Sequence, residues 1–138
     1  MIELAYGPLV PDQVTAKVRL DRNGAVVTFL GTTRKISEGR QVLYLEYEAY
    51  PEMAVNKLEE IRLEVKERWG TEDVAIAHRL GRLEIEEISL VVAVASPHRK
   101  EAFLACQYIV ERIKEMVPIW KKEVFQGGGY HWVACEAH

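Results

Sequence analysis

The sequence is poor in cysteine: its 138 residues include two, Cys106 and Cys135, which are too few for a disulfide framework. It lacks the glycine-rich motifs that bind nucleotides, the GxSxG motif of serine hydrolases and the HExxH motif of zinc peptidases. No apolar run is long enough to span a bilayer, and the first residues, MIELAYGPLV, do not read as a secretory signal. Together these absences predict a cytoplasmic protein that uses none of the common catalytic motifs.

An excess of positive charge is absent as well. The formal net charge is −3, and the 49% hydrophobic and 28% charged residues are typical of a soluble globular protein. This balance gives no support to a general role on nucleic acids or membrane surfaces, so any site for an anion must be local. The length fits one domain or two small lobes that share a core, and we predict a single domain over residues 1–138.

The pattern of metal-binding residue types predicts no metal site. The four histidines are scattered along the chain. His131 and Cys135 are four residues apart, but a strand would separate them by about 13 Å, too far for one metal ion. Cys106 falls on the apolar stripe of a predicted helix and is expected in the core. We therefore propose neither a metal nor a cysteine nucleophile.

The most informative stretch runs from residue 96 to residue 123, SPHRKEAFLACQYIVERIKEMVPIWKKE. Ser96 is placed to cap a helix, and Pro97 suits its first turn. Pro118 cannot continue the helix, so we expect its end at about Val117. One apolar stripe recurs at spacings of three and four residues, and its members are Phe103, Cys106, Val110, Ile113 and Val117.

Two basic residues, His98 and Arg99, fall in the first turn of this predicted helix. The helix dipole disfavours cations there, whereas the free N–H groups of the turn attract anions. Two cations at this position would be explained by an anionic ligand that binds between them. The alternative is a solvated helix end.

Other basic residues extend this pattern. Lys114 lies at the edge of the apolar stripe, and Lys121 and Lys122 follow the apolar segment 118–120. Arg34 follows a predicted strand, where binding residues are common. Each of these side chains taken alone is typical of a solvated surface, but together with the helix start they favour an anion pocket.

Periodicity and turn residues predict the remaining elements. Strands are expected at residues 2–4, 24–32, 42–50, 74–79, 83–85, 88–95 and 130–135, and helices at residues 11–20, 51–69 and 97–117. The strand at 24–32 is apolar on both faces and is expected to be central. The polar segment 35–41 is expected to be a mobile loop. This order of elements predicts a two-layer α+β architecture.

Two details of these elements bear on the core. The strand at 42–50 is expected to bury one face, with Glu46 and Glu48 on a solvated face, and the buried residues are Leu43, Leu45, Tyr47 and Ala49. The helix at 51–69 is expected to end at Gly70 and to bury Ala54, Leu58, Ile61 and Val65.

Several stretches in one order resemble the large, catalytic subunit of molybdopterin synthase, over about Gly24 to Trp132. These stretches are GAVVTFLGTTR, LEYEAYPEMA, HRLG, SPHRKEAF and VPIWKKE. The resemblance implies an α/β-hammerhead fold, an α+β class in which a mixed, mostly antiparallel sheet packs with two long helices. It also implies a sulfurtransferase that converts cyclic pyranopterin monophosphate to molybdopterin by inserting two sulfurs.

The same resemblance implies partners. The sulfur would come from a small ubiquitin-like subunit whose C-terminal Gly-Gly ends in a thiocarboxylate. The assembly would be a heterotetramer around a central homodimer of large subunits. No metal or organic cofactor would be needed by the large subunit.

The resemblance also carries residue roles. Arg34, His98 and Arg99 would bind the substrate phosphate and pterin. Lys114 and Lys121 would act as acid–base groups or charge stabilisers and also contact substrate, with Lys122 as a further substrate contact. The aromatic residue Phe29 would line the pocket. The tail, with Glu136 and ending at His138, is not expected to reach a neighbouring site.

Two other classes of function fit the residues alone. One is a non-catalytic module that holds an anionic metabolite or the tail of a partner. The other is a purely structural subunit. Product formation from cyclic pyranopterin monophosphate and a thiocarboxylated partner would separate them from the enzyme.

Overall fold

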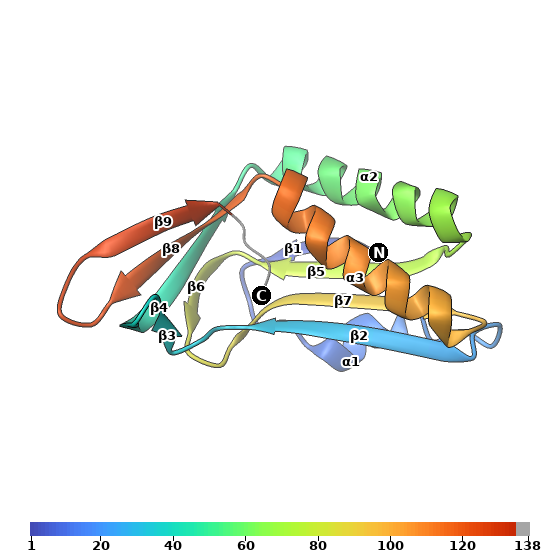
Figure 1. Ribbon diagram of the computed structural model, residues 1–138, viewed down its shortest axis with the longest axis horizontal. Coiled ribbons are helices and arrows are strands. Elements are labelled where there is room, and N and C mark those ends of the chain that lie inside the picture. Colours follow the sequence, from blue (N-terminus) through green and yellow to red (C-terminus); the bar gives the residue numbers. More distant parts are fainter. Residues whose placement is uncertain (135–138) are drawn as a thin grey trace.

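Two β-sheets and three helices make up the computed structural model, which describes residues 1–134 (Figure 1). The inner sheet has the order β1-β5-β7-β2, with β1 (Ile2–Ala5), β5 (Asp73–Arg79), β7 (Ile88–Ser96) and β2 (Ala25–Thr32). The outer sheet has the order β3-β4-β8-β9 with β6 paired to β4, and consists of β3 (Ile36–Ser37), β4 (Arg40–Ala49), β6 (Gly81–Glu84), β8 (Ile119–Phe125) and β9 (Tyr130–Ala134). The helices are α1 (Pro11–Ala16), α2 (Pro51–Trp69) and α3 (Arg99–Met116).

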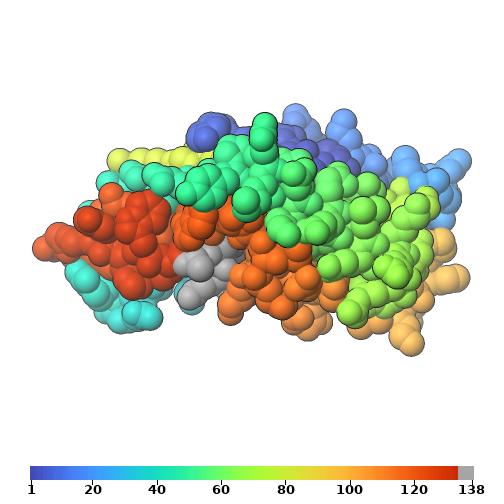
Figure 2. Space-filling model, turned by 90° about the horizontal axis from the view of Figure 1, so that it is seen from above, coloured from blue at the N-terminus to red at the C-terminus, as the bar shows by residue number. Residues whose placement is uncertain are grey.

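The inner sheet is covered on both faces. The long helices α2 and α3 lie side by side on one face, and the short helix α1 lies on the other (Figure 1). Strand β1 is parallel to β5, whereas the other pairs in the sheet are antiparallel. The outer sheet projects from one end of this body (Figure 1), and the red residues at the left of Figure 2 belong to this end. The predicted α+β class, with a mixed, mostly antiparallel sheet and two long helices, is confirmed.

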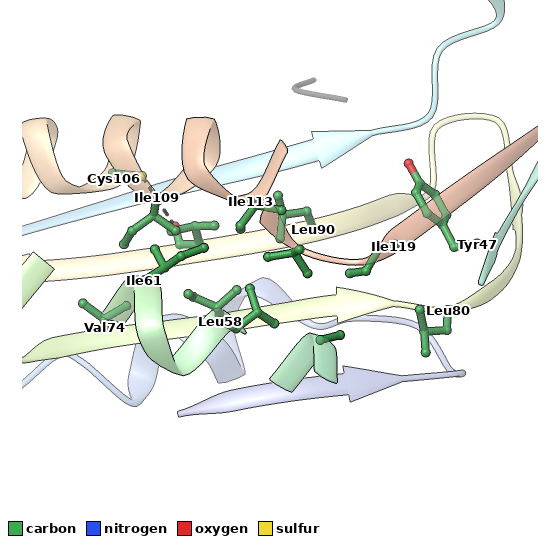
Figure 3. Packing of buried hydrophobic residues seen from close by; sticks show 14 of the residues in the cluster. Tyr47, Leu58, Ile61, Val74, Leu80, Leu90, Cys106, Ile109, Ile113 and Ile119 are labelled. Atoms are coloured by element: carbon green, nitrogen blue, oxygen red, sulfur yellow. Dashed lines mark hydrogen bonds between the residues drawn. The ribbon is translucent and has the colours of Figure 1, made fainter. Parts of the chain in front are cut away.

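The main core lies between the inner sheet and the two long helices. Leu58 and Ile61 of α2 meet Ile109 and Ile113 of α3 over β7, and each is at most 1% exposed (Figure 3). The buried face predicted for the helix at 51–69 is confirmed, because all of its members are fully buried. The helix ends, as predicted, at Gly70, whose φ of 68° is left-handed and therefore suits glycine.

The prediction that the strand at 24–32 is central is wrong. Strand β2 pairs with β7 on one side and forms an edge of the inner sheet. Val26 and Leu30 are 38% and 42% exposed, although both are apolar. An apolar strand is expected to be buried, but sequence does not say whether the same chain or another covers it.

Two predictions for residues 35–50 need correction. The segment expected to be a mobile loop contains β3 and the first residues of β4, which pair as a hairpin. A register shift between Val42 and Tyr44 against β8 then displaces the alternation of β4. As a result Val42 is buried and Leu43 is 47% exposed, the reverse of the expectation.

The third helix also differs from its prediction. Ser96 is a buried residue of β7, and His98 occupies the N-cap position without a side-chain capping hydrogen bond. Phe103 is 61% exposed, and the buried face consists of Ala102, Ala105, Cys106, Ile109 and Ile113. Phe103 lies beside this buried stripe rather than on it and therefore faces solvent. The end of the helix at about Val117 is confirmed, since Val117 is its C-cap.

Helix α1 and strand β8 also differ from the predictions. Helix α1 ends at Ala16, before the expected residue 20. Strand β8 was not predicted as a strand, and it holds both lysines of the pair. Strand β9 is described to Ala134, so the predicted end at Cys135 lies outside the described residues.

None of the helices described here is both long and apolar enough to cross a membrane. A single domain over residues 1–138 stays a prediction.

Candidate active site

A cavity of about 190 Å³ opens where β2 leaves the inner sheet and the chain enters the outer sheet. It lies between the end of β2, the β3 segment and the strands β4 and β8. Its polar lining includes Arg34, Lys121 and Glu123, and its apolar lining includes Phe29, Leu30 and Leu45. Phe29 therefore lies where the resemblance implied. The cavity combines two cations, one carboxylate and an apolar wall.

The pairing of β8 with β4 sets the position of Lys121. Lys121 lies opposite Tyr47, and alternate residues of a strand point to opposite faces. Lys121 therefore points into the cavity, where its side chain is 12% exposed. Tyr47 is 2% exposed, and its ring meets that of His78 edge-on at 5.0 Å. Figure 3 shows Tyr47 at the end of the core nearest the outer sheet.

Glu123 is the functional candidate that the sequence analysis missed. It lies two residues after Lys121 on the same face of β8, and its side chain is 8% exposed. Its Oε2 atom lies 3.9 Å from Lys121 Nζ. Reading residues 119–125 as an alternating strand would have placed Ile119, Lys121, Glu123 and Phe125 on one face.

Arg34 follows a firmly held backbone. The amide of Thr33 donates to the carbonyl of Glu87 at 3.1 Å, and the amide of Glu86 donates to the carbonyl of Thr33 at 2.9 Å. The Glu87 carboxylate accepts from the backbone of Glu84 and pairs with Arg79 at 2.6 Å, and both contacts lower its pKa. Arg34 itself is exposed and reaches the cavity from this anchored position.

His98 and Arg99 lie far from that cavity within one chain. They line a separate, open groove with Gly24, Ala25 and Phe103, at the beginning of β2. Gly24 is required there, because a Cβ atom would lie 2.7 Å from the carbonyl oxygen of Pro97. The eight residues of β2 span roughly 26 Å, so the groove and the cavity occupy opposite ends of the strand.

The remaining predicted cations are also apart from the cavity. Lys114 is exposed in the last turn of α3. Lys122 lies on the opposite face of β8 from Lys121, with its Nζ 4.5 Å from the ring centre of Tyr130 and 5.9 Å from that of Trp132. Of the predicted cations, the cavity therefore brings together Arg34 and Lys121. The others could join them only through another chain or a bound ligand.

The cysteines differ in what the structure describes. Cys106 is 5% exposed among core residues, as predicted, and burial raises the pKa of its thiol to about 11. A thiol with this pKa is a poor nucleophile at neutral pH. Cys135 and the tail from Glu136 to His138 lie outside the described residues. Within residues 1–134, no three side chains of the types that bind metals are grouped together; that none is needed stays a prediction.

Comparison with known proteins gives consistent relatives. Residues 4–116 match the family model described as MoaE protein. The chain is 50% identical over 121 residues to the molybdopterin synthase catalytic subunit of Halalkalibacterium halodurans, covering 88% of this chain and 78% of that one. The X-ray crystal structure of molybdopterin synthase from Staphylococcus aureus matches with a TM-score of 0.91 and 44% identity, over 96% of both chains.

A more distant solved structure shares the fold alone. It is a protein–protein complex of subunits 1 and 2 of the molybdopterin-converting factor from Helicobacter pylori. The match has a TM-score of 0.78 at 20% identity and covers 98% of this chain and 90% of that one.

Proposed function

This chain belongs to the MoaE protein family, and we propose that the cavity around Lys121 is the place where it transfers sulfur. Its function is that of a molybdopterin synthase catalytic subunit, an enzyme of molybdenum cofactor biosynthesis. The proposed reaction converts cyclic pyranopterin monophosphate to molybdopterin by inserting two sulfurs as a dithiolene. The observation that carries the proposal is the side chain of Lys121, 12% exposed, in a cavity that Arg34 also lines.

The charges of the cavity fit this chemistry. The substrate carries a phosphate and the proposed sulfur donor carries a thiocarboxylate, so both are anions. Arg34 can bind a phosphate through two parallel N–H groups, and Lys121 can stabilise charge or move a proton at the reacting carbon. Lys114 is proposed as the second catalytic group, acting when the substrate and the donor tail extend to the last turn of α3. Lys122 is proposed as a peripheral substrate contact.

The proposed partner is a small sulfur-carrier subunit. A catalytic subunit implies a second subunit, and the distant relative from Helicobacter pylori is described as a complex of two subunits. We propose a ubiquitin-like partner whose Gly-Gly tail ends in a thiocarboxylate. Two glycines present no side chains, so such a tail suits a cavity of about 190 Å³ better than a bulkier peptide would.

The separation of the basic residues is explained if two copies of the chain pair through β2. Strand β2 has a free edge and exposes the apolar residues Val26 and Leu30 on one face, where side chains of a second copy paired at that edge would pack against them. Two edges related by a two-fold axis pair antiparallel, so the beginning of one β2 lies beside the end of the other. His98 and Arg99 of one copy would then face Arg34 of the second copy.

The sulfur-transfer function is tested by turnover in a complex with a thiocarboxylated partner. Lys121→Ala should lower dithiolene formation by about 10²- to 10⁴-fold, as expected for a lost acid–base group. Lys17→Ala, an exposed residue at the end of α1, is the control and should turn over normally. If Lys121→Ala forms product at the normal rate, the catalytic assignment is wrong and a binding or structural role becomes the better explanation.

The shared site is tested by mixing two slow variants. In a hybrid dimer of Arg34→Ala with Arg99→Ala, one site contains both arginines and the other contains neither. Coexpression in equal amounts should therefore recover about a quarter of the wild-type turnover, because half of the dimers are hybrids and half of their sites are intact. A mixture that stays as slow as each variant alone would show that the two arginines do not share a site across copies.

A further inference from the structure

Glu123 is a carboxylate in an unusual place. It lies on β8, between the strands β4 and β9, opposite Leu45 and His131. The residue is 6% exposed. Among residues 1–134, Lys121 is its one ion-pair partner and no side chain donates a hydrogen bond to it. The separation of 3.9 Å is an ion-pair distance, longer than the 2.7–3.2 Å of a typical N–H···O hydrogen bond.

The stability of the fold does not explain this carboxylate. Removing a carboxylate from water is unfavourable, and a buried ion pair often recovers less than that cost. An apolar side chain on this face of β8 would extend the surface formed by Ile119 and Phe125, which are both buried. The charge at residue 123 therefore calls for a role other than packing.

Affinity for the substrate does not explain it either. The proposed ligands of the cavity are anions, and a carboxylate repels them. Arg34 and Lys121 alone would give the cavity a more positive charge than it has with Glu123. Glu123 therefore opposes the binding of an anionic ligand, and its contribution must act on another group in the cavity.

The group that it faces is the catalytic ammonium. A lysine side chain is long and flexible, and its ammonium is a point charge without a preferred direction. In this cavity Arg34 repels that ammonium, while an anionic substrate attracts it toward the phosphate. An opposite charge on the same strand face, two residues away, counteracts both displacements. Because the contact is longer than a hydrogen bond, Lys121 remains free to donate to the reacting atoms.

We propose that Glu123 is a positioning residue, which holds the ammonium of Lys121 at the reacting carbon rather than at the substrate phosphate. The proposal rests on the proposed catalytic role of Lys121. It assigns Glu123 no contact with the substrate. Its consequence is a split between rate and binding: loss of the carboxylate should slow the chemical step without weakening the binding of the substrate.

The test compares Glu123→Gln with the wild type in the complex with a thiocarboxylated small subunit and cyclic pyranopterin monophosphate. The substitution removes the charge and keeps the shape. It should lower kcat roughly 10- to 100-fold, the effect of a catalytic group displaced by about 1 Å, and leave KM unchanged or lower. Glu48→Gln, on the exposed face of β4, is the matched control and should change neither constant. A kcat within about twofold of wild type, or a loss that lies wholly in a raised KM, overturns the proposal.

Two further variants separate the possible explanations. Adding Glu123→Gln to Lys121→Ala should cause no further loss, because Glu123 acts through the lysine; a further tenfold loss would overturn the proposal. Glu123→Asp keeps the charge and should recover part of kcat relative to Glu123→Gln, and no recovery would count against it. Normal turnover by Lys121→Ala itself would show that the proposed function of Lys121 has failed. A slow Lys121→Ala beside a normal Glu123→Gln would show that the positioning role alone has failed.

Discussion

The inner and outer sheets differ in what their strands bury. Strand β7 of the inner sheet lies between α1 on one side and the two long helices on the other, and its residues from 89 to 96 are all buried. Strand β8 of the outer sheet alternates instead, and one of its faces carries Lys121 and Glu123 between two buried apolar residues. Burial in the inner sheet is apolar and stabilises the fold, whereas burial in the outer sheet includes charge and shapes the cavity.

The largest effect that tests this comparison is expected in the inner core. Leu58→Ala removes a fully buried side chain of α2 and should lower the free energy of unfolding by about 2–5 kcal/mol. Leu63→Ala, on the same helix but 55% exposed, should change it by less than about 0.5 kcal/mol. Thermal or urea unfolding measures both. If Leu58→Ala instead keeps its stability and loses turnover per folded molecule, the assignment of stability to the inner sheet and of the cavity to the outer sheet is wrong.

Sequence predicted the inner sheet and its helices better than the outer sheet. The helix at 51–69 and the strand at 88–95 have long, regular apolar patterns, and other parts of the same chain bury these apolar residues. Strand β2 has an equally apolar pattern, but it lies at an edge of the sheet. The prediction failed because an apolar pattern does not indicate which chain, if any, covers the strand. Phe103 has a different explanation: the buried face of its helix runs through Ala102, Ala105 and Cys106, and Phe103 lies beside that face.

Only part of the candidate site was predicted, because part of it depends on a strand that was not predicted. The pattern of basic residues and the resemblance both pointed to Arg34 and Lys121, which the structure places in one cavity. Lys121 and Lys122 were interpreted as a basic pair after the apolar segment 118–120 rather than as part of a strand, and this interpretation missed strand β8 and with it Glu123. The irregular pairing that exposes Leu43 depends on β8 as well, so it could not be read from the pattern of β4 alone.

Arg99 tests whether the inner sheet also contributes to the site. It lies at the end of the inner sheet and is proposed to act on the cavity of a second copy. Arg99→Ala should weaken binding of cyclic pyranopterin monophosphate by about 1.5–3 kcal/mol, the range for a hydrogen bond to a charged group. Binding of the small subunit should change less. Calorimetry with each ligand measures the affinity for the substrate and the affinity for the small subunit. Arg22→Ala is unsuitable as a control, because Arg22 pairs with Asp73. Arg19→Ala, an exposed residue outside the cavity and the groove, is the better one. Unchanged substrate affinity would show that Arg99 is only a solvated residue.

A charged contact also links the two long helices, outside the cavity. The Glu64 carboxylate accepts hydrogen bonds from Arg112 at 3.0 and 3.1 Å and from the Tyr108 hydroxyl at 2.6 Å, and these bonds lower its pKa. A lowered pKa in the folded state stabilises the fold above the unfolded value of about 4.5, and this contribution is lost as the pH falls through the folded pKa.

Glu64→Gln should therefore lower stability by about 1–2 kcal/mol at neutral pH, and the difference from wild type should shrink below pH 4.5. Glu67→Gln, an exposed neighbour on α2, is the control and should leave stability at neutral pH unchanged. Unfolding curves at several pH values measure both variants. Turnover at neutral pH should be unchanged in folded protein, since the contact lies outside the cavity. A difference from wild type that persists at low pH would mean that shape rather than charge is responsible.

The smallest effect is expected from the thiols, although sulfur is what the enzyme transfers. Cys106 lies in the inner core, and its pKa of about 11 leaves almost no thiolate at neutral pH. The double variant Cys106→Ala, Cys135→Ser should therefore keep its turnover with a thiocarboxylated partner, and the small cavity left at Cys106 should cost about 1 kcal/mol of stability. Cys106→Ser alone is a useful companion, since it puts a hydroxyl in the same buried place and leaves Cys135 intact. If the double variant folds but makes no dithiolene, a sulfur of this chain takes part in the transfer. The outer-sheet cavity would then not be the whole of the site, and the proposed partner-tail mechanism would be wrong.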